Sequence, residues 1–178
     1  MDSKSKNILL LGLVMSIPIF IMFLLSHFFN FGESRLFDII DILVFILSIF
    51  FIQKYYRDNF YKGQASYSKL FGGTLLMICI SGIILALVNY FTMKFVSPET
   101  ISEGLELSKG ELYSNNMLSD SEIELGVKYM EKIATPFVFA LGTLLGYVFT
   151  GIIINLITSA INQRKGDGFY DAMNEISE

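Results

Sequence analysis

The stretch Ile133–Gln163 reads IATPFVFALGTLLGYVFTGIIINLITSAINQ and runs for 31 residues without an Asp, Glu, Lys or Arg. Two other stretches share this property, Asn7–Gly32 with 26 residues and Leu70–Met93 with 24. A helix that crosses a bilayer needs roughly 20 predominantly apolar residues, so all three are long enough. A shorter charge-free stretch, Ile42–Gln53, is extended upstream by the mostly apolar Leu36–Ile40. The sequence therefore predicts four membrane crossings.

Composition agrees with a membrane class. Of the 178 residues, 53% are hydrophobic and only 17% are charged, and the mean hydropathy is +0.55, unlike a typical soluble domain. The net charge of −4 and the lack of a basic stripe argue against a nucleic-acid partner. Cys79 is the only cysteine, which excludes a disulfide framework and a cysteine-based metal motif. We expect one membrane domain over residues 1–178, with no metal and no cofactor.

The predicted spans cover about residues 8–30, 36–55, 69–93 and 134–161. A helix pairs its own backbone groups, so it is the element expected to cross lipid. Lys4 and Lys6 before an apolar run are typical of a signal peptide, but this run is longer than the usual core of about 7–15 residues. No small-residue cleavage site follows it. We therefore expect an all-α, four-helix fold that retains its first helix.

The placement of Lys and Arg predicts the orientation. With the N-terminus in the cytoplasm, the cytoplasmic segments hold eight cations: Lys4, Lys6, Lys54, Arg57, Lys62, Lys69, Arg164 and Lys165. The other side holds five, spread over a greater length: Arg35, Lys94, Lys109, Lys128 and Lys132. Four crossings return the chain to its starting side, so both termini are expected in the cytoplasm.

The second loop, Gln53–Lys69, alternates basic with aromatic residues. Tyrosine favours the headgroup layer, and each basic residue there attracts anionic lipid by about 1 kcal/mol. This pattern predicts an ordinary interfacial belt that contacts membrane lipids. A specific lipid-headgroup site is the alternative.

The third loop, residues 94–133, is expected outside the cytoplasm and carries eight acidic residues against four lysines. Ser97-Pro98 predicts the start of a first short helix. Ser119–Glu122 matches a capping box, and an apolar face follows it: Ile123, Val127, Met130 and Ala134. We expect an amphipathic helix over Ser119–Ile133, with Glu124 and Lys128 paired on its wet side. Its apolar face either packs on the bundle or a partner, or lies on the membrane surface.

Four phrases distinguish the chain: SYSKLFG at residues 66–72, LSDSEIE at 118–124, YMEKIATP at 129–136 and GTLLGY at 142–147. With them the chain resembles a family of bacterial integral membrane proteins that have four predicted helices and are known only as a domain of unknown function. The resemblance implies the fold and a location in the bacterial inner (plasma) membrane. It implies no catalytic residue and no substrate.

Gly142 and Gly146 form a GxxxG motif in the last predicted helix. Small residues four apart let two helix backbones approach closely in lipid. The motif predicts a helix contact, either inside the bundle or across a homodimer.

Asp38 and Asp41 lie one turn apart at the start of the second predicted helix, and His27 is near the end of the first. Together they form a candidate outward-facing site for a cation or proton. The alternative is that the two acids lie near the interface, where they suit the helix dipole.

The spans contain few other polar residues, whose default role is structural hydrogen bonding; Asn89 and Asn155 are one pair that could meet across the third and fourth helices. Motifs of hydrolases, metalloproteases and nucleotide-binding enzymes are absent from the sequence. The sequence therefore favours a protein that is not an enzyme: an accessory or scaffold subunit with a membrane protein partner, or a homo-oligomer. The alternative is a small-solute or ion transporter that works as an oligomer.

Overall fold

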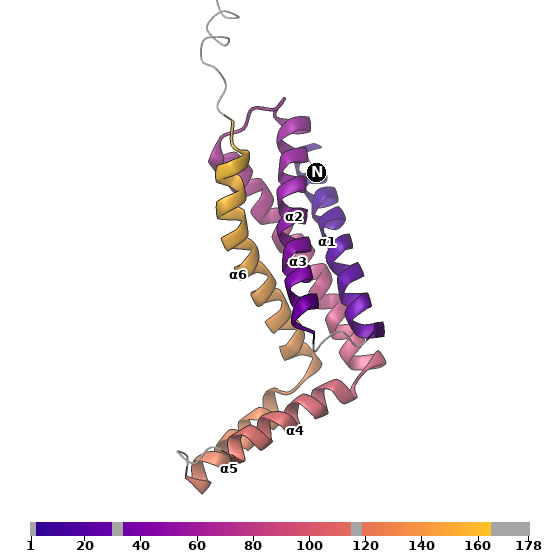
Figure 1. Ribbon diagram of the computed structural model, residues 1–178, viewed down its shortest axis with the longest axis vertical. Coiled ribbons are helices and arrows are strands. Elements are labelled where there is room, and N and C mark those ends of the chain that lie inside the picture. Colours follow the sequence, from indigo (N-terminus) through magenta and orange to yellow (C-terminus); the bar gives the residue numbers. More distant parts are fainter. Residues whose placement is uncertain (1–2, 30–33, 115–118, 165–178) are drawn as a thin grey trace, which may run out of the picture. The chain divides into compact units, whose positions relative to one another are not determined.

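The computed structural model describes residues 3–29, 34–114 and 119–164, and these segments are almost entirely helical (Figure 1). The described segments contain six α-helices and one π-helical turn: α1 (Ser3–Phe29), α2 (Arg35–Phe60), α3 (Tyr67–Phe91), η2 (Thr92–Val96), α4 (Glu99–Tyr113), α5 (Asp120–Ile133) and α6 (Pro136–Asn162). The described residues contain no strand, only one isolated bridge between Ala65 and Arg164. The predicted all-α fold is confirmed.

Four of these helices are long and apolar enough to cross a membrane: Ser5–Phe29, Arg35–Phe60, Tyr67–Val96 and Pro136–Asn162. Large apolar side chains on them stay exposed, as expected of surfaces that face lipid; Phe149 is 68% exposed and Phe51 58%. The predicted set of four spans is confirmed, and the chain has the character of a multi-pass integral membrane protein. α4 and α5 are the predicted short helices between the third and fourth spans.

The second span is longer than predicted, because α2 continues to Phe60 instead of ending near residue 55. Tyr56 is 1% exposed and Arg57 4%, so their assignment to a headgroup belt was wrong. Gln53, Tyr56 and Arg57 recur at helical spacing and form one buried face, which a count of charges along the chain does not reveal. The remaining loop is short and turns at Lys62 and Gly63, both with positive φ.

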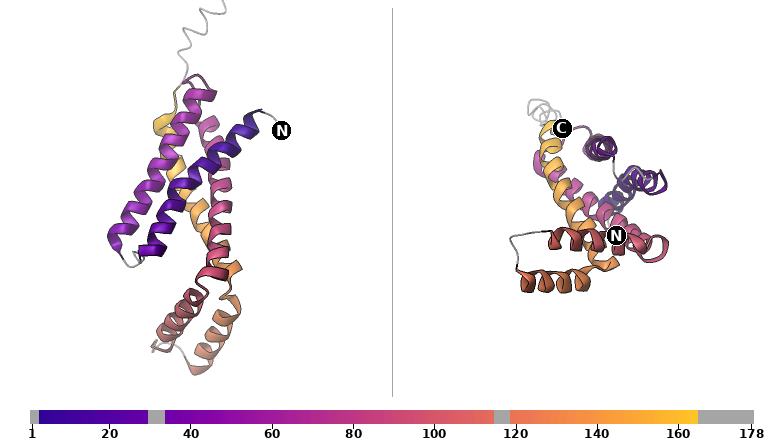
Figure 2. Two further views of the ribbon diagram at one scale, coloured as in Figure 1. Left: turned by 90° about the vertical axis from the view of Figure 1, so that its right-hand side faces the viewer. Right: turned by 60° about the horizontal axis from the view of Figure 1, so that its bottom comes forward.

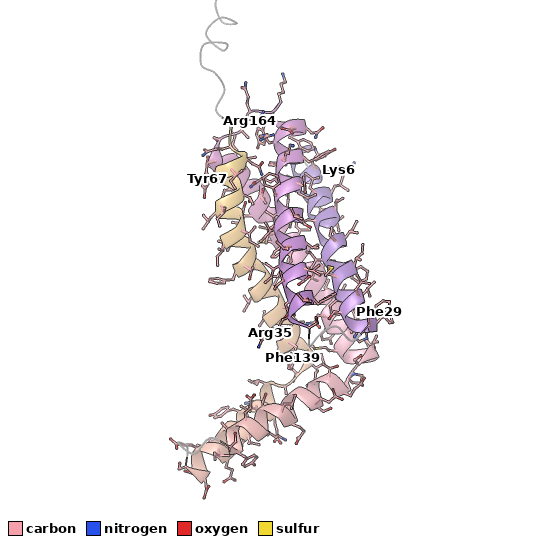
Figure 3. All side chains as sticks on the ribbon, viewed as in Figure 1. Lys6, Phe29, Arg35, Tyr67, Phe139 and Arg164 are labelled. Atoms are coloured by element: carbon pink, nitrogen blue, oxygen red, sulfur yellow. The ribbon has the colours of Figure 1, made fainter. Side chains whose placement is uncertain are left out.

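The chain groups into two compact units. The first unit contains residues 1–82 and 147–178, that is α1, α2, the first part of α3 and the last part of α6. These helices run side by side (Figures 1 and 2) around a core that includes Met15, Ile49, Met77 and Ile78. Lys6, Tyr67 and Arg164 lie at one end of this unit, and Phe29 and Arg35 at the other (Figure 3).

Close helix contacts in the first unit depend on glycine. A Cβ on Gly73 of α3 would overlap the Tyr56 ring of α2, and a Cβ on Gly151 of α6 would lie 2.7 Å from Cγ2 of Ile78. Small residues at such crossings let backbones approach, which favours helix association in lipid. Gly72, the neighbour of Gly73, has nothing within 4 Å of a Cβ position.

The second unit contains residues 83–146: the end of α3, η2, the α4–α5 hairpin and the start of α6. α4 and α5 lie antiparallel and side by side (Figures 1 and 2). Leu112 of α4 sits over Gly126 of α5, where a Cβ would come within 2.7 Å of Leu112 Cδ2. The glycine therefore sets how closely the hairpin closes.

The pair Gly72 and Gly73 offers a matched test of this packing. Gly73→Ala places a methyl group against the buried Tyr56 ring, so we expect a loss of about 1–3 kcal/mol of stability, the usual cost of overpacking. Gly72→Ala adds the same methyl group into open space and should leave stability unchanged or slightly higher. Thermal unfolding in mild detergent, followed by size-exclusion chromatography, measures both. Equal behaviour of the two variants would contradict the Gly73–Tyr56 contact.

Candidate functional site

The most polar part of the first unit's interior is a layer shared by three helices, which we call the buried polar layer. Its members are buried to 97% or more: Gln53 on α2, Thr74 on α3, and Asn155, Ser159 and Asn162 on α6. On α6 the spacing of 155, 159 and 162 places the three side chains on one face. The layer therefore joins α2, α3 and α6.

The Gln53 amide is the centre of the layer. Its Nε2 lies 3.0 Å from Asn155 Oδ1, 2.7 Å from Ser159 Oγ and 3.3 Å from Thr74 Oγ1, so its two hydrogens are shared among three acceptors. Its Oε1 accepts a hydrogen bond of 3.0 Å from Asn162 Nδ2. One side chain thus connects α2 to both other helices.

The outer members of the layer bond to helix backbones. Asn155 Nδ2 donates to the Phe71 carbonyl at 3.0 Å, and Asn162 Nδ2 lies 3.3 Å from the Phe50 carbonyl. Helix carbonyls have a second lone pair, so these bonds do not break the helices. Asparagine thereby ties side chains of α6 to the backbones of α2 and α3.

Arg57 closes the layer at the end of α6. Its Nη1 donates to the Asn162 carbonyl at 2.9 Å, one of the carbonyls left unpaired at a helix C-terminus. The positive charge also suits the negative end of the helix dipole. Asp58 accepts from Arg57 Nε at 2.7 Å and pairs with its charge. Arg57 is buried without being left unpaired.

The buried polar layer is built for packing. In the described part of the chain, every buried side-chain nitrogen and oxygen has a hydrogen-bond partner. Apart from Arg57 at its edge, the layer consists of amides and hydroxyls, which neither titrate near neutral pH nor act as nucleophiles without a base. A fully paired polar network rigidifies an interior and defines its arrangement. The layer holds the register of three helices.

The contact that the sequence allowed between Asn89 and Asn155 is not formed in the described structure. Asn89 Nδ2 donates instead to Thr143 Oγ1 at 2.5 Å in the second unit, and Asn155 joins the buried polar layer. Gln53 and Asn162 were missed because they fall at the edges of the charge-free stretches, where a polar residue is expected to face water. The sequence did contain a signal for them: Gln53 precedes Arg57 by four residues and Asn162 follows Ser159 by three, so each continues a polar face of its helix.

The structure places His27 and the two acids on different helices. His27 stacks on Phe23 with 6.3 Å between ring centroids and meets Phe28 edge-on. Asp38 is exposed in the first turn of α2, and Asp41 is half-buried one turn later. Among the described residues, no three His, Cys, Asp or Glu side chains are grouped so as to hold a metal ion. A cation or proton site at these residues stays a prediction.

Gly142 and Gly146 make no close helix contact in the described structure: nothing lies within 4 Å of a Cβ position at either. Within the first unit, Gly12, Gly73 and Gly151 provide the close approaches. Glycine spacing alone does not say which face of a helix meets its neighbour. A helix contact at Gly142 and Gly146, inside the bundle or across a homodimer, stays a prediction.

The α4–α5 hairpin is the second candidate region, and its ends are held by polar contacts. Ser119 begins α5 with the predicted capping box. Its backbone N–H donates to the Glu122 carboxylate at 2.9 Å, which lowers the pKa of Glu122. Lys109 of α4 pairs at 3.0 Å with Glu131 of α5 and with Glu106, and these bonds raise the pKa of Lys109. The predicted amphipathic helix is confirmed.

The inner face of α5 is the predicted one. Ile123 is buried, and Met130, Ala134 and the partly exposed Ile133 line a cavity of about 440 Å³ with residues of α4 and the start of α6. A second apolar row on α5 was not predicted. Leu125, Tyr129 and Ile133, at i, i+4 and i+8, are 56%, 65% and 54% exposed. We call this row the α5 stripe.

Gln53→Leu tests the buried polar layer. A hydrogen bond between helices in lipid contributes about 0.6 kcal/mol on average, so loss of the four Gln53 contacts should cost about 2 kcal/mol. Thr143→Val removes one bond between helices, from Asn89, together with the bond of Thr143 Oγ1 to the Phe139 carbonyl of its own helix, and should cost about a quarter of that. Reversible unfolding in mixed detergent micelles measures both. If the two variants lost the same free energy of unfolding, the four Gln53 hydrogen bonds would not stabilise the fold more than the single Asn89 bond does.

Comparison with known proteins finds a relative and a family, both without an established function. An uncharacterised protein of Methanocaldococcus jannaschii is 32% identical over 140 residues, which make up 76% of this chain and 33% of that protein. The chain thus spans about a third of the length of this relative. No solved structure matches the chain. Residues 9–164 match the family described as protein of unknown function DUF4199, and the chain therefore belongs to that family.

Proposed function

We propose that this protein is a non-catalytic accessory or scaffold subunit that offers its α4–α5 hairpin to a membrane protein partner. The observation that carries the proposal is the α5 stripe. Leu125, Tyr129 and Ile133 form an apolar row more than half exposed on a helix that has already buried another apolar face. An exposed apolar row with an aromatic residue is typical of a protein interface.

The hairpin is formed before a partner arrives, which supports a docking role. Lys109 joins both helices through Glu106 and Glu131, and Leu112 packs over Gly126. The capping box fixes where α5 begins. Binding through a preformed element avoids the entropic cost of ordering it.

The charge of the hairpin supports a protein partner with a basic surface. Eight acidic and three lysine residues lie between Glu99 and Ile133. Anionic lipid repels such a surface, whereas a basic protein surface attracts it and gains rate and specificity. Glu124 and Lys128 flank the α5 stripe and belong to the polar rim that such interfaces carry.

The buried polar layer supports a role without catalysis. Its amides and hydroxyls bond to one another and to helix backbones. The polar groups of the layer are therefore used to pack helices against one another. This supports a role in which the protein binds a partner and catalyses no reaction.

We propose the same orientation as the sequence predicts, with both termini in the cytoplasm of a bacterium and the hairpin on the outer side of its inner membrane. One end of the first unit, which we call the basic end, carries six described cations: Lys6, Lys54, Arg57, Lys62, Lys69 and Arg164. Asp58 is the single described acid there. This excess of positive charge supports a cytoplasmic position for the basic end.

The partner is sought by purification from the native membrane in mild detergent and intact-complex mass spectrometry. We expect a stoichiometric membrane protein with the wild type, and its loss with the double variant Leu125→Ser, Tyr129→Ser. Ser121→Ala, an exposed change on the same helix, should keep it. If only copies of this chain were found in the complex, the proposed partner would be wrong and the protein would be a homo-oligomer. Solute flux in proteoliposomes would favour the transporter.

Cysteine labelling tests the orientation in a Cys79→Ala background. In intact cells, a membrane-impermeant maleimide should modify Glu124→Cys in the hairpin. Lys62→Cys, in the turn after α2, should react only after the membrane is opened, because its side chain would face the cytoplasm. Both positions are exposed in the folded chain. The reverse labelling pattern would overturn the proposed orientation.

A further inference from the structure

A groove runs between α1 and α2 in the first unit. It consists of two adjoining cavities of about 650 and 310 Å³ that share Val14, Phe51 and Ile52 in their walls. The larger one reaches Asn7 and Tyr55, and the smaller one reaches Pro18. α1 and α2 separate toward the end that carries the N-terminus (Figure 2). The larger of the two cavities lies toward the basic end.

The length of the groove matches one leaflet. Asn7 and Pro18 are eleven residues apart on α1, which corresponds to about 16 Å at 1.5 Å per residue. Half of a hydrocarbon core of about 30 Å is close to this length. α1 and α2 are both candidate spans, so the groove lies along the acyl chains of the surrounding lipid.

The walls of the groove are mostly apolar, and polar groups join them at its mouth. Leu10, Leu11 and Val14 of α1 face Phe51 and Ile52 of α2 along its length. At the mouth the lining gains the Asn7 amide and Tyr55, which is 52% exposed, beside the Phe60 ring. A tyrosine at this depth is typical of the headgroup layer. The apolar length of the groove matches an acyl chain, and the polar groups at its mouth match a phospholipid head group.

Two lysines lie about one helical turn from residues that line the groove. Lys6 precedes Leu10 by four residues and Lys54 follows Phe51 by three, so each continues a helix face that lines the groove. Asp58, the nearest described acid on α2, pairs with Arg57 and also interacts with Lys54 and Arg164. Positive charge therefore prevails at the mouth, which favours an anionic head group over a zwitterionic one.

We propose that the α1–α2 groove holds one anionic phospholipid, with an acyl chain along Val14 and Phe51 and its head group at Lys6 and Lys54. This inference needs only the membrane position of the two helices. It stands independently of the hairpin's partner. The lipid would complete the α1–α2 face of the first unit and differ from the annular lipids around it by slow exchange and by head-group selection.

Native mass spectrometry of the full chain in mild detergent tests the proposal, with phosphatidylglycerol or phosphatidylcholine of equal chain length as probes. We expect one retained phosphatidylglycerol per wild-type chain and at least a tenfold weaker retention of phosphatidylcholine. Val14→Trp fills the part common to both cavities and should reduce the retained lipid about tenfold. Leu145→Trp, at an exposed position of α6 outside the groove, is the matched control and should retain it.

The head-group contact is tested separately. Lys6→Gln with Lys54→Gln should abolish the preference for phosphatidylglycerol, since each lysine near the surface changes anionic lipid binding about fivefold. Lys128→Gln in the hairpin should leave the preference intact. The lysine variants change exposed side chains, so they remain informative if Val14→Trp does not fold. Equal retention of both lipids by the wild type, or retention unchanged by both Val14→Trp and the lysine variants, would overturn the proposal.

Discussion

The hydrogen bonds of the Gln53 amide are the constraint on which the first unit depends. In an interior without water, an unpaired amide is costly, so α2, α3 and α6 must take a rotation and a height at which Thr74, Asn155, Ser159 and Asn162 meet Gln53. A slip of one helix by one turn would break several of these bonds at once. Apolar packing in lipid lacks this precision, because lipid tails compete equally for every apolar face.

The consequences of this constraint extend to the basic end. Because Gln53 faces inward, Tyr56 and Arg57 on the next turn of α2 also face inward. Tyr56 then packs against Gly73, and Arg57 reaches the last turn of α6. Lys54, on another face of α2, stays exposed beside the α1–α2 groove. One face of α2 therefore packs in the core of the first unit, and another face of the same helix is exposed to the membrane.

The hairpin is stabilised by other contacts than the first unit, because apolar and charged residues are interspersed along its helices. Its stability comes from local features: a capping box, a lysine between two glutamates and a leucine over a glycine. The capping box and the Lys109–Glu106 pair act within one helix turn, and the Lys109–Glu131 and Leu112–Gly126 contacts join the two helices of the hairpin. The α5 stripe stays more than half exposed, and of its members only Ile133 lines the cavity between α4, α5 and α6 in the described structure.

The sequence by itself determined the elements that depend on composition along the chain. Charge-free stretches of sufficient length predicted the four spans, and the spacing from Ser119 to Ala134 predicted α5 with its cap and inner face. Only the tertiary structure decided which faces of the spans meet. It placed Gln53 and Arg57 inside, separated Asn89 from Asn155, and showed that close helix approaches in the first unit occur at Gly73 and Gly151. The physical reason is that helices apolar on all sides carry no periodic signal for their rotation, so a few polar contacts between distant residues set it.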